Sequence, residues 1–588
     1  MIIDILESNE KAYSERYGVS LRGMLKHALE CNGISDEAVA FYNDYFRRSA
    51  EQSTRFDPSS CSGKLLWLLC GFADGTYVRR LLDDFPEASK VLLYEPDEAS
   101  FIYCCCINDV ADIIKMDSLC LIVYDEIKTD LLYETLQKEI SLLNYDHMGS
   151  LVAPGYESFY NEIYNSMLQT VKNIASDTGN DVANILRFKE DTCRNELFSL
   201  SQISDNYLVE DFIHNISTRE VPLIIVAAGP SLKKNAAALE YAKGKSLIIA
   251  VSHAAKKLDD EGIIPDFIAV SDPHPDADFL QYDHERKHRL IASSAANRKN
   301  QADYNGKLFY HSFSKETFPY DFVQRMGDEI STGSVATDIF KIFLDAGFTK
   351  FILVGQDLAY GENGETHATG NTSEQPQNNE IWVKGISGRE IRTRQDWLGF
   401  KTYYEEQILS HPEITVIDAT EGGAYIEGSE CMSLIQAIKK FCISEYDFTD
   451  CCRSLPHAIS NEEEEYIKKD LLNCTDKIDL FREKSEKAVE LNLKIQGVIL
   501  GIYEKEADFA ENCASYDRLY HELLDDRSVP LIFRYMSESL ARYNKNALVY
   551  EQNQDIYGRL KEELELFKAF QEKLPELKEF IKYLMTES

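Results

Sequence analysis

A series of short apolar runs between residues 220 and 430, each followed by polar residues and often an amphipathic helix, constrains the fold of this chain most strongly. Continuous apolar runs of four or five residues are typical of strands buried on both faces of a parallel sheet. Strands that alternate with helices predict right-handed β-α-β units, and so an α/β fold with a doubly wound, Rossmann-like sheet. The predicted strands are residues 223–227, 247–251, 267–270, 290–293, 308–311, 350–354 and 414–417, and the predicted helices are 232–242, 253–261 and 335–346.

The chain has 588 residues, which predicts several domains rather than one. Changes in the hydrophobic pattern divide it into five parts. These are an N-terminal helical segment (1–60), a small Rossmann-like α/β domain (61–150), a helical connector (151–215), the central α/β domain (216–450) and an all-α C-terminal domain (451–588). In the last part, helices are expected at 491–503 and 560–574, with Pro530 and Pro575 interrupting the helical pattern.

The charge balance limits the partners. There are 62 basic and 99 acidic residues, which gives a formal net charge of -37. Nucleic acids and anionic membranes are both held by Lys and Arg, so neither is an expected partner. The longest apolar runs are strand-length and do not approach the ~20 residues that a membrane span requires.

The cysteines and the N-terminus indicate a compartment. The 14 cysteines form no C-x-x-C pair and no zinc-binding spacing, so we expect reduced thiols and no metal site built from them. The N-terminus lacks the basic start and the apolar stretch of a secretory signal. We therefore expect a cytoplasmic protein.

The small N-terminal α/β domain contains a glycine turn that resembles a nucleotide-binding loop. Strands are predicted at 65–70, 90–94 and 119–123, with a helix at 76–85. Gly71 and Gly75 follow the first strand, and Glu95 follows the second. In Rossmann-like folds such glycines approach a phosphate and such an acid accepts hydrogen bonds from ribose. One glycine of the full fingerprint is missing, so a nucleotide site and a scaffold that binds nothing both remain open.

The central domain has a comparable turn after its first strand. Gly229, Pro230 and Ser231 stand between that strand and a helix. Glycine permits close approach, proline suits the first helical turn, and serine adds a hydroxyl beside free N–H groups. This combination predicts a phosphate site.

Further polar residues follow later strands and should lie at the same edge of the sheet, since ligands of such sheets bind at the carboxyl ends of strands. Ser252 follows the second strand and Asp272 follows the third, where it is placed to accept hydrogen bonds from a ribose or a base. Thr332, Gly333 and Ser334 precede a helix and form a second hydroxyl-rich helix start.

A polar segment of about 35 residues follows the strand at 350–354, and its length predicts a functional loop, such as a lid over an anionic substrate. A last strand ends close to Glu421. Carboxylates at strand ends and a histidine in the polar segment are candidates for acid–base chemistry. The candidate residues of this region are Gly355, Asp357, Tyr360, His367, Arg389, Arg392 and Glu421.

Taken together, these motifs resemble the motility-associated factor (Maf) flagellin glycosyltransferases, whose central domain is similar to bacterial sialyltransferases. The resemblance covers nearly the whole chain, including the flanking domains. The motifs that carry it are Ala228-Gly229-Pro230-Ser231-Leu232, Pro265-Asp266-Phe267 with Asp272-Pro273, Thr332-Gly333-Ser334-Val335-Ala336, Gly355-Gln356-Asp357-Leu358-Ala359-Tyr360 with His367-Ala368, and Thr420-Glu421-Gly422-Gly423-Ala424.

The resemblance implies a protein O-glycosyltransferase. Its donor would be a CMP-activated nonulosonic acid, pseudaminic or legionaminic acid, and its acceptors Ser or Thr hydroxyls of flagellin. The donor would contact the residues around the glycine turn, Ser252, Asp272 and the Thr332 turn. His367 is the first candidate for the base, followed by Asp357 and Glu421, and Arg389 and Arg392 would pair with the sugar carboxylate. No cofactor is expected, because helix-start N–H groups would neutralise the leaving CMP, and a need for a divalent metal stays open.

Two other functions remain. Archaeal 6-hydroxymethylpterin diphosphokinases share the Gly-Pro-Ser-Leu turn and would need Mg²⁺ on carboxylates such as Asp272 and Asp357. Alternatively, the chain is a non-catalytic assembly factor that holds flagellin through its helical ends.

Overall fold

The structure is a computed structural model. It describes residues 2–18, 20–21, 65–79, 90–124, 131–141, 144–145, 147–153, 156, 160–274, 289–304, 306–328, 330, 332–368, 381–503, 508–552 and 555–587. These residues fall into two compact units. Unit 1 comprises Met1–Arg187, Ser485–His521 and Ser537–Phe570, and unit 2 comprises Phe188–Lys484, Glu522–Met536 and Gln571–Ser588.

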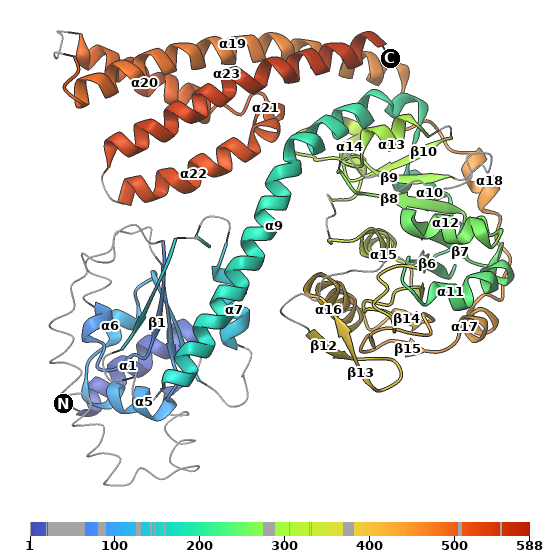
Figure 1. Cartoon of the computed structure of the whole chain (residues 1–588), viewed down its shortest axis with the longest axis horizontal. Helices are drawn as coiled ribbons and strands as arrows, with labels where there is room; N and C mark the ends of the chain where they lie inside the picture. The colour runs from blue at the N-terminus through green and yellow to red at the C-terminus, as the bar shows by residue number, and fades with distance from the viewer. Residues whose placement is uncertain are drawn as a thin grey trace. The chain divides into compact units, whose positions relative to one another are not determined.

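The central sheet of unit 2 confirms the predicted α/β fold. Among the described residues it has nine strands in the order β15-β14-β11-β6-β7-β8-β9-β10-β5, and every pairing is parallel. Figure 1 shows helices α11 and α12 at one side of strands β6 and β7. The strands are β5 (Tyr207–Leu208), β6 (Leu223–Val226), β7 (Leu247–Val251), β8 (Phe267–Val270), β9 (Leu290–Ser293), β10 (Leu308–His311), β11 (Lys350–Val354), β14 (Thr415–Asp418) and β15 (Glu430–Cys431).

All seven strands predicted in the central region are present, within a residue or two of the expected bounds. The short edge strands β5 and β15 were not predicted, because runs of two residues give no period. The predicted helix at 232–242 is an α-helix, α11 (Leu232–Asn235), that continues as a 3-10 helix (Ala236–Ala242). Helices α12 (Ser252–Asp260) and α15 (Val335–Asp345) agree with prediction.

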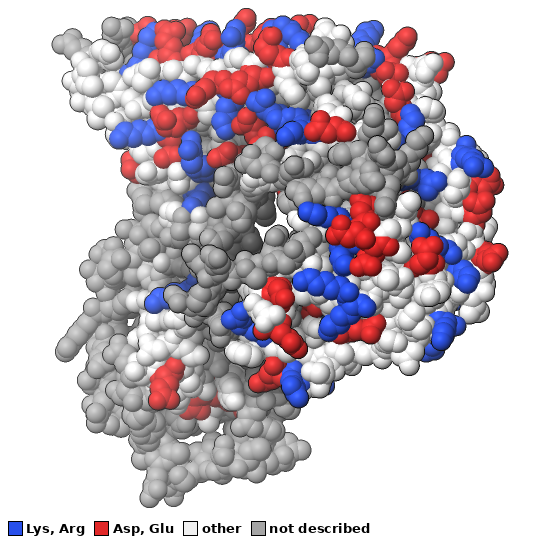
Figure 2. All heavy atoms as spheres, turned by 45° about the vertical axis from the view of Figure 1, so that its right-hand side comes forward, with Lys and Arg blue, Asp and Glu red and all other residues white. Residues whose placement is uncertain are grey.

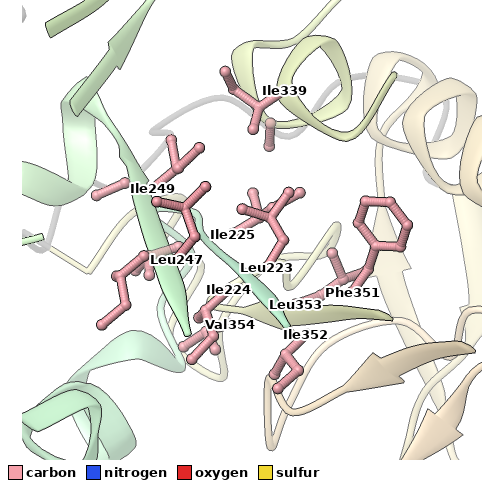
Figure 3. Close-up of a cluster of buried hydrophobic side chains, with 14 of the residues drawn as sticks. Leu223, Ile224, Ile225, Leu247, Ile249, Ile339, Phe351, Ile352, Leu353 and Val354 are labelled. Carbon is pink, nitrogen blue, oxygen red and sulfur yellow. The ribbon is translucent and has the colours of Figure 1, made fainter. Parts of the chain in front are cut away.

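The core of this domain explains the continuous apolar runs. The side chains of β6, β7 and β11 are almost completely excluded from solvent, as both faces of the sheet are covered. Figure 3 shows these side chains on either face of the strands, with Ile339 of α15 over one of them. Burial on both faces is what makes these strands read as unbroken apolar runs.

The polar segment after β11 contains an antiparallel hairpin, β12 (Ile381–Lys384) and β13 (Glu390–Thr393), followed by helix α16 (Gln395–Ser410). The hairpin turn is tied to the loop after β14, since Ile386 N–H donates to Gly423 O at 3.0 Å and Tyr425 N–H donates to Lys384 O at 2.8 Å. The described part of the predicted lid is therefore anchored to its own domain. Residues 369–380 lie outside the described residues.

In unit 1 a second parallel sheet has the order β3-β2-β1-β4. The strands β1 (Leu66–Cys70), β2 (Lys90–Glu95) and β3 (Leu119–Val123) confirm the prediction, and helix α5 (Glu98–Ile107) follows β2. Strand β4 (Met148–Val152) was missed, since its sequence MGSLV is half-exposed and contains little apolar signal. Of the helix expected at 76–85, residues 76–79 are helical and the rest lie outside the described residues. Residues 22–60 of the predicted N-terminal helical segment also lie outside the described residues.

The described elements after residue 460 are helical, and the predicted connector holds helices α9 and α10 but also the short strand β5 of the central sheet. The expectation that Pro575 ends a helix is wrong, because it lies inside α23. The apolar side chains Leu574, Leu577 and Ile581 are buried on both sides of the proline, and this burial outweighs the lost backbone hydrogen bond. The other described α-helices are α1 (Ile2–Tyr17), α6 (Ala111–Ile114), α7 (Leu131–Glu139), α9 (Asn161–Ser201), α10 (Val209–Asn215), α13 (Arg298–Ala302), α14 (Asp321–Arg325), α17 (Leu434–Phe441), α18 (Phe448–Arg453), α19 (Asn461–Ile499), α20 (Phe509–Leu524), α21 (Pro530–Tyr535), α22 (Ser537–Gln552) and α23 (Ile556–Glu587).

Surface charge is mixed. Figure 2 shows acidic and basic side chains interspersed over the described surface in that view. None of the described helices is both long and apolar enough to cross a membrane.

Candidate functional site

The strand order of the central sheet reverses at β6. The chain passes from β6 to β7 and β8 on one side, whereas β11 and then β14 lie on the other side. In open α/β sheets ligands bind at the carboxyl ends of the strands at such a switch point. Two of the predicted motifs, the Gly229 turn after β6 and Asp357 after β11, meet there.

Ser231 and Asp357 form the closest contact across this point. Ser231 Oγ donates a hydrogen bond to Asp357 Oδ2 at 2.7 Å, and Ser231 N–H lies 3.2 Å from both carboxylate oxygens. Both side chains are more than 90% buried. The loops after β6 and β11 are therefore joined through this pair.

The glycines around the pair permit the close approach. A Cβ at Gly229 would overlap Asp357 Oδ2 and Gly355 O, and Gly229 N–H donates to that carbonyl at 2.8 Å. Gly355 has a φ of +65°, and Gly423 has a φ of +80° at a position where a Cβ would overlap the Asp357 backbone. These glycines are needed for packing the loops against one another.

The same contacts change the expected role of the turn. The N–H of Gly229 bonds to Gly355, that of Ser231 to Asp357, and that of Leu232 to Gly229 O at 3.1 Å, while Pro230 has no N–H. The donors expected to meet a phosphate are thus already engaged within the protein. A phosphate at this turn would have to displace the Asp357 carboxylate.

Two buried carboxyl groups lie at this edge. Burial raises the pKa of Asp357 to about 6, against the opposing effect of its hydrogen bonds from Ser231. Burial also raises the pKa of Asp418, at the end of β14, to about 6, and the nearby Asp357 adds to the shift. Asp418 Oδ1 accepts from Thr420 N–H at 3.1 Å, whereas Oδ2 accepts no hydrogen bond from the described residues. Both groups are thus set to titrate near neutral pH.

His367 lies beside the end of β6. The next residue, Ala368, donates its N–H to Ala228 O at 2.8 Å, which fixes this part of the loop. His367 Nδ1 is 3.0 Å from Thr366 Oγ1, and its ring centroid is 5.3 Å from that of His253. Burial lowers the pKa of His367, and His253 and Arg394 lower it further. The imidazole is therefore held in its neutral form, which a proton acceptor requires.

The residues predicted after β7 and β8 lie on the β7 side of the switch point. Ser252 is the first residue of α12 and is buried. Asp272 Oδ1 accepts from His274 N–H at 2.8 Å, and Asp272 O accepts from Asn297 N–H at 2.9 Å. Asp272 is close enough to His253 to oppose the lowering of its pKa by burial.

The Thr332 turn forms a separate hydroxyl-rich cluster at the start of α15. Ser334 caps the helix by accepting from Thr337 N–H at 3.2 Å. Thr332 donates to Asp338 Oδ1 through its N–H at 2.9 Å and its hydroxyl at 2.8 Å. Asp338 is also hydrogen-bonded by Ser271. This connects the turn to the end of β8, next to Asp272. Gly333, with a φ of +91°, packs against Phe400.

Only one of the two predicted lid arginines lies near other site residues. The Arg392 guanidinium stacks 4.6 Å from the ring centroid of Tyr360, whose N–H donates to Arg392 O at 3.0 Å. Tyr360 in turn lies 5.0 Å from Trp397. Arg389 is exposed in the turn between β12 and β13. The structure therefore places Arg392, rather than Arg389, beside the polar edge.

Glu421 has a structural role that its sequence position did not indicate. Its Oε1 accepts from Leu434 N–H at 3.0 Å and from Asn235 Nδ2 at 3.2 Å, so it adds an acceptor to the cap of helix α17, whose N-cap residue is Ser433. Its φ is +60°, which turns the loop around Asp357. Glu421 is thus brought to the switch point by its backbone, whereas its carboxylate is directed to a helix end.

Three basic residues at this edge were not among the predicted site residues. His253 faces His367, and Arg394 lies over Trp397 at 4.0 Å and near His367. Lys234 Nζ donates to Glu421 O at 3.2 Å and lies close enough to lower the pKa of Asp357. His253 is one residue from Ser252, and Lys234 is three residues from Ser231, so their proximity in sequence to predicted site residues could have identified them. Arg394 gave none, because its neighbours come from distant segments.

The glycine turn of unit 1 is filled by the domain's own side chains. Glu95 is completely buried, and its Oε2 accepts from Phe72 N–H at 2.7 Å and from Tyr156 Oη at 2.6 Å. A Cβ at Gly71 would overlap the Tyr156 ring. Burial raises the pKa of Glu95 to about 8. Of the two interpretations, these contacts favour a scaffold over a nucleotide site.

The carboxylates proposed to hold Mg²⁺ follow strands that are not neighbours. Asp272 follows β8 and Asp357 follows β11, three positions apart in the sheet, or roughly 14 Å at about 4.8 Å per strand. The described residues contain no group of three or more His, Cys, Asp or Glu side chains arranged to hold a metal ion.

Comparison with known proteins relates this chain to two groups. Residues 194–363 match the family described as 6-hydroxymethylpterin diphosphokinase MptE-like. The structure is similar to that of a Maf glycosyltransferase from Magnetospirillum magneticum AMB-1, with a TM-score of 0.55 and 13% sequence identity, over 100% of this chain and 98% of that chain. No curated protein sequence matches. The resemblance to Maf glycosyltransferases is thereby confirmed as a likeness of fold over the whole chain.

Proposed function

We propose that this protein is a glycosyltransferase that transfers a nonulosonic acid from its CMP-activated form to Ser or Thr hydroxyls of flagellin. The likeness of fold to the Maf glycosyltransferase over the full length of both chains carries this proposal. The polar residues at the sheet's switch point support it, because they supply a neutral imidazole, buried carboxyls and nearby cationic side chains.

In the proposed reaction the acceptor oxygen attacks the anomeric carbon of the sugar. The bond from that carbon to the CMP phosphate breaks, and CMP leaves with the electron pair. His367 accepts the hydroxyl proton, for which its neutral form is suited. Asp357 and Asp418 place negative charge near a developing oxocarbenium ion when they are ionised. Arg392 is the nearer candidate partner of the sugar carboxylate.

The leaving phosphate needs positive charge, and the N–H groups of the Ser231 turn are engaged. Lys234 and Arg394 provide cationic side chains at the same edge. No divalent metal is required in this scheme.

The test incubates the purified protein with flagellin and either CMP-pseudaminic or CMP-legionaminic acid. The intact mass of flagellin and the released CMP are measured, with and without EDTA. We expect a mass increase of one or more sugar residues, equal CMP release, and no effect of EDTA. A reaction without donor and an Asp357→Asn variant serve as controls. Unchanged flagellin with both donors would contradict the proposal.

A second candidate is diphosphate transfer from ATP, which the family match over residues 194–363 favours. The assay is ATP, Mg²⁺ and 6-hydroxymethyldihydropterin, with AMP as the product measured. AMP formation that EDTA abolishes would support this candidate over glycosyl transfer. Stable flagellin binding without a mass change or AMP formation would instead indicate a non-catalytic holding role.

A further inference from the structure

His253 and His367 form an imidazole pair at the edge of the central sheet. His253 is the second residue of α12, directly after β7, and His367 lies in the loop after β11. Their ring centroids are 5.3 Å apart and the rings are tilted by 35°. A backbone hydrogen bond from Ala368 to Ala228 holds the loop at the end of β6, next to β7. The pairing is thus set by the main chain on both sides.

Two charged groups act on the pair, and they come from different parts of the fold. Asp272, after β8, acts on His253, and Arg394, at the start of α16, acts on His367. An acid, two imidazoles and a guanidinium therefore influence one another in the order Asp272, His253, His367, Arg394. His367 has cationic or potentially cationic neighbours in His253 and Arg394. Asp272 favours placing any proton of the pair on His253.

We propose that His253 is a positioning residue, which holds the ring of His367 so that His367 can take the proton of the acceptor hydroxyl. This inference rests on the proposed function, in which His367 is the base. In the tautomer whose Nδ1–H donates to the Thr366 hydroxyl, 3.0 Å away, the lone pair is on Nε2, and we assign the acceptor's proton to that atom. The acceptor O–H bond breaks and its proton goes to His367, while the acceptor oxygen forms the new bond to the anomeric carbon. The bond from that carbon to CMP breaks, and CMP leaves with its electron pair.

The electrostatic part of this role follows from the spacing of the rings. A proton on His253 disfavours a second proton 5.3 Å away on His367. In bulk water the repulsion at that distance corresponds to roughly half a pH unit, and partial burial of the two rings increases it. Replacing His253 by a neutral side chain of similar length is therefore expected to raise the pH at which His367 titrates.

The first experiment measures the titration of His367 directly. The full chain is labelled at its 12 histidines with ¹³C, and the His367 signal is assigned by its loss in His367→Gln. In His253→Gln we expect the His367 titration to move upward by at least about half a pH unit. In Asp272→Asn we expect a smaller upward movement, because His253 is then less protonated. His411→Gln is the matched control, since His411 lies at the far end of α16.

The second experiment measures the pH profile of flagellin glycosylation. In His253→Gln the acid-side inflection of kcat/KM is expected to move upward with the His367 titration, with a fall in kcat on the plateau. A merely structural role would lower activity without moving the inflection. An unchanged His367 titration in folded His253→Gln overturns the proposal, whatever the transferase assay shows. If the His367 titration moves in His253→Gln but the native protein transfers no sugar, the pairing of the two histidines is supported and only the proposed function is contradicted.

Discussion

Ser231 Oγ donates a hydrogen bond to Asp357 Oδ2 at 2.7 Å, across the point where the strand order of the central sheet reverses. The pair joins the loop after β6 to the loop after β11 and is shielded from water. A glycine turn that was expected to receive a phosphate instead receives a carboxylate of the same chain. The turn is thus both a packing element and the place where a buried acid is held.

The first prediction concerns the pH dependence of this pair. Ser231→Ala is expected to lower the free energy of unfolding by about 1–3 kcal/mol at pH 7.5 and by less at pH 5. Burial raises the pKa of Asp357 to about 6, so the native state loses stability as pH rises towards 6 and the carboxyl ionises. The hydrogen bonds from Ser231 stabilise the ionised Asp357 carboxylate. In Ser231→Ala the free energy of unfolding should therefore continue to fall to a higher pH than in the native protein.

Urea unfolding of both proteins at pH 5 and 7.5 tests this. Ser387→Ala, in the exposed turn between β12 and β13, is the control and should change little at either pH. An equal effect of Ser231→Ala at both values would show that the hydroxyl does not act on the charged carboxylate.

The second prediction compares two glycines of unit 2. Gly229→Ala is expected to lower the free energy of unfolding by about 2 kcal/mol or more and to abolish activity, because its Cβ would overlap Asp357 Oδ2 and Gly355 O. Gly399→Ala, in α16, has nothing within 4 Å of the added Cβ and should be neutral or stabilising by up to about 1 kcal/mol. Thermal unfolding and the transfer assay give both readouts. If Gly229→Ala lowered the free energy of unfolding only slightly, the Asp357 side chain could move aside at little energetic cost.

The central sheet could be predicted from the sequence because burial on both faces leaves an unbroken apolar run at each main strand. Strand β4 could not, since its Gly149 and Ser150 carry no such signal. The predicted helix end at Pro575 was wrong because the prediction used only the local effect of proline. In the structure the apolar side chains on both sides of Pro575 are buried, and the helix continues through it.

For the site, position along the sheet edge was predictable and side-chain direction was not. Ser231 and Asp357 were placed at strand ends by the alternation of strands and helices alone, and His367 was placed in the polar segment after the strand at 350–354. Whether a carboxylate turns inward, as Asp357 does, or caps a helix, as Glu421 does, depends on segments distant in sequence. The same holds for the contact of His253 with His367.

The third prediction separates two candidate bases. His367→Gln is expected to lower kcat for glycosyl transfer by about 10²–10⁴-fold, the usual contribution of a general base. Glu421→Gln keeps an amide oxygen to cap α17, so activity should stay within a few-fold of the native value. Initial rates of CMP release at saturating donor measure both. The reverse order of effects would assign the base to Glu421.

The last prediction concerns the glycine turn of unit 1. Glu95 is buried, and its oxygens accept from the N–H groups of Phe72 and Asp97 and from the Tyr156 hydroxyl. Burial raises its pKa to about 8 from an ordinary value of 4.5. A raised carboxyl pKa means that stability is fully present below pH 4.5 and is lost as pH rises through 8. Glu95→Gln should therefore be less stable than the native chain at pH 5, because an amide cannot accept at both of its ends. The deficit should shrink towards pH 9, where the native carboxylate is ionised.

Hydrogen exchange of peptides covering β1 and β2, corrected for the intrinsic pH effect, measures this local stability difference. Asp117→Asn, an exposed site in the same unit, is the control. A deficit that stays constant from pH 5 to 9 would mean that Glu95 is already ionised in the native state.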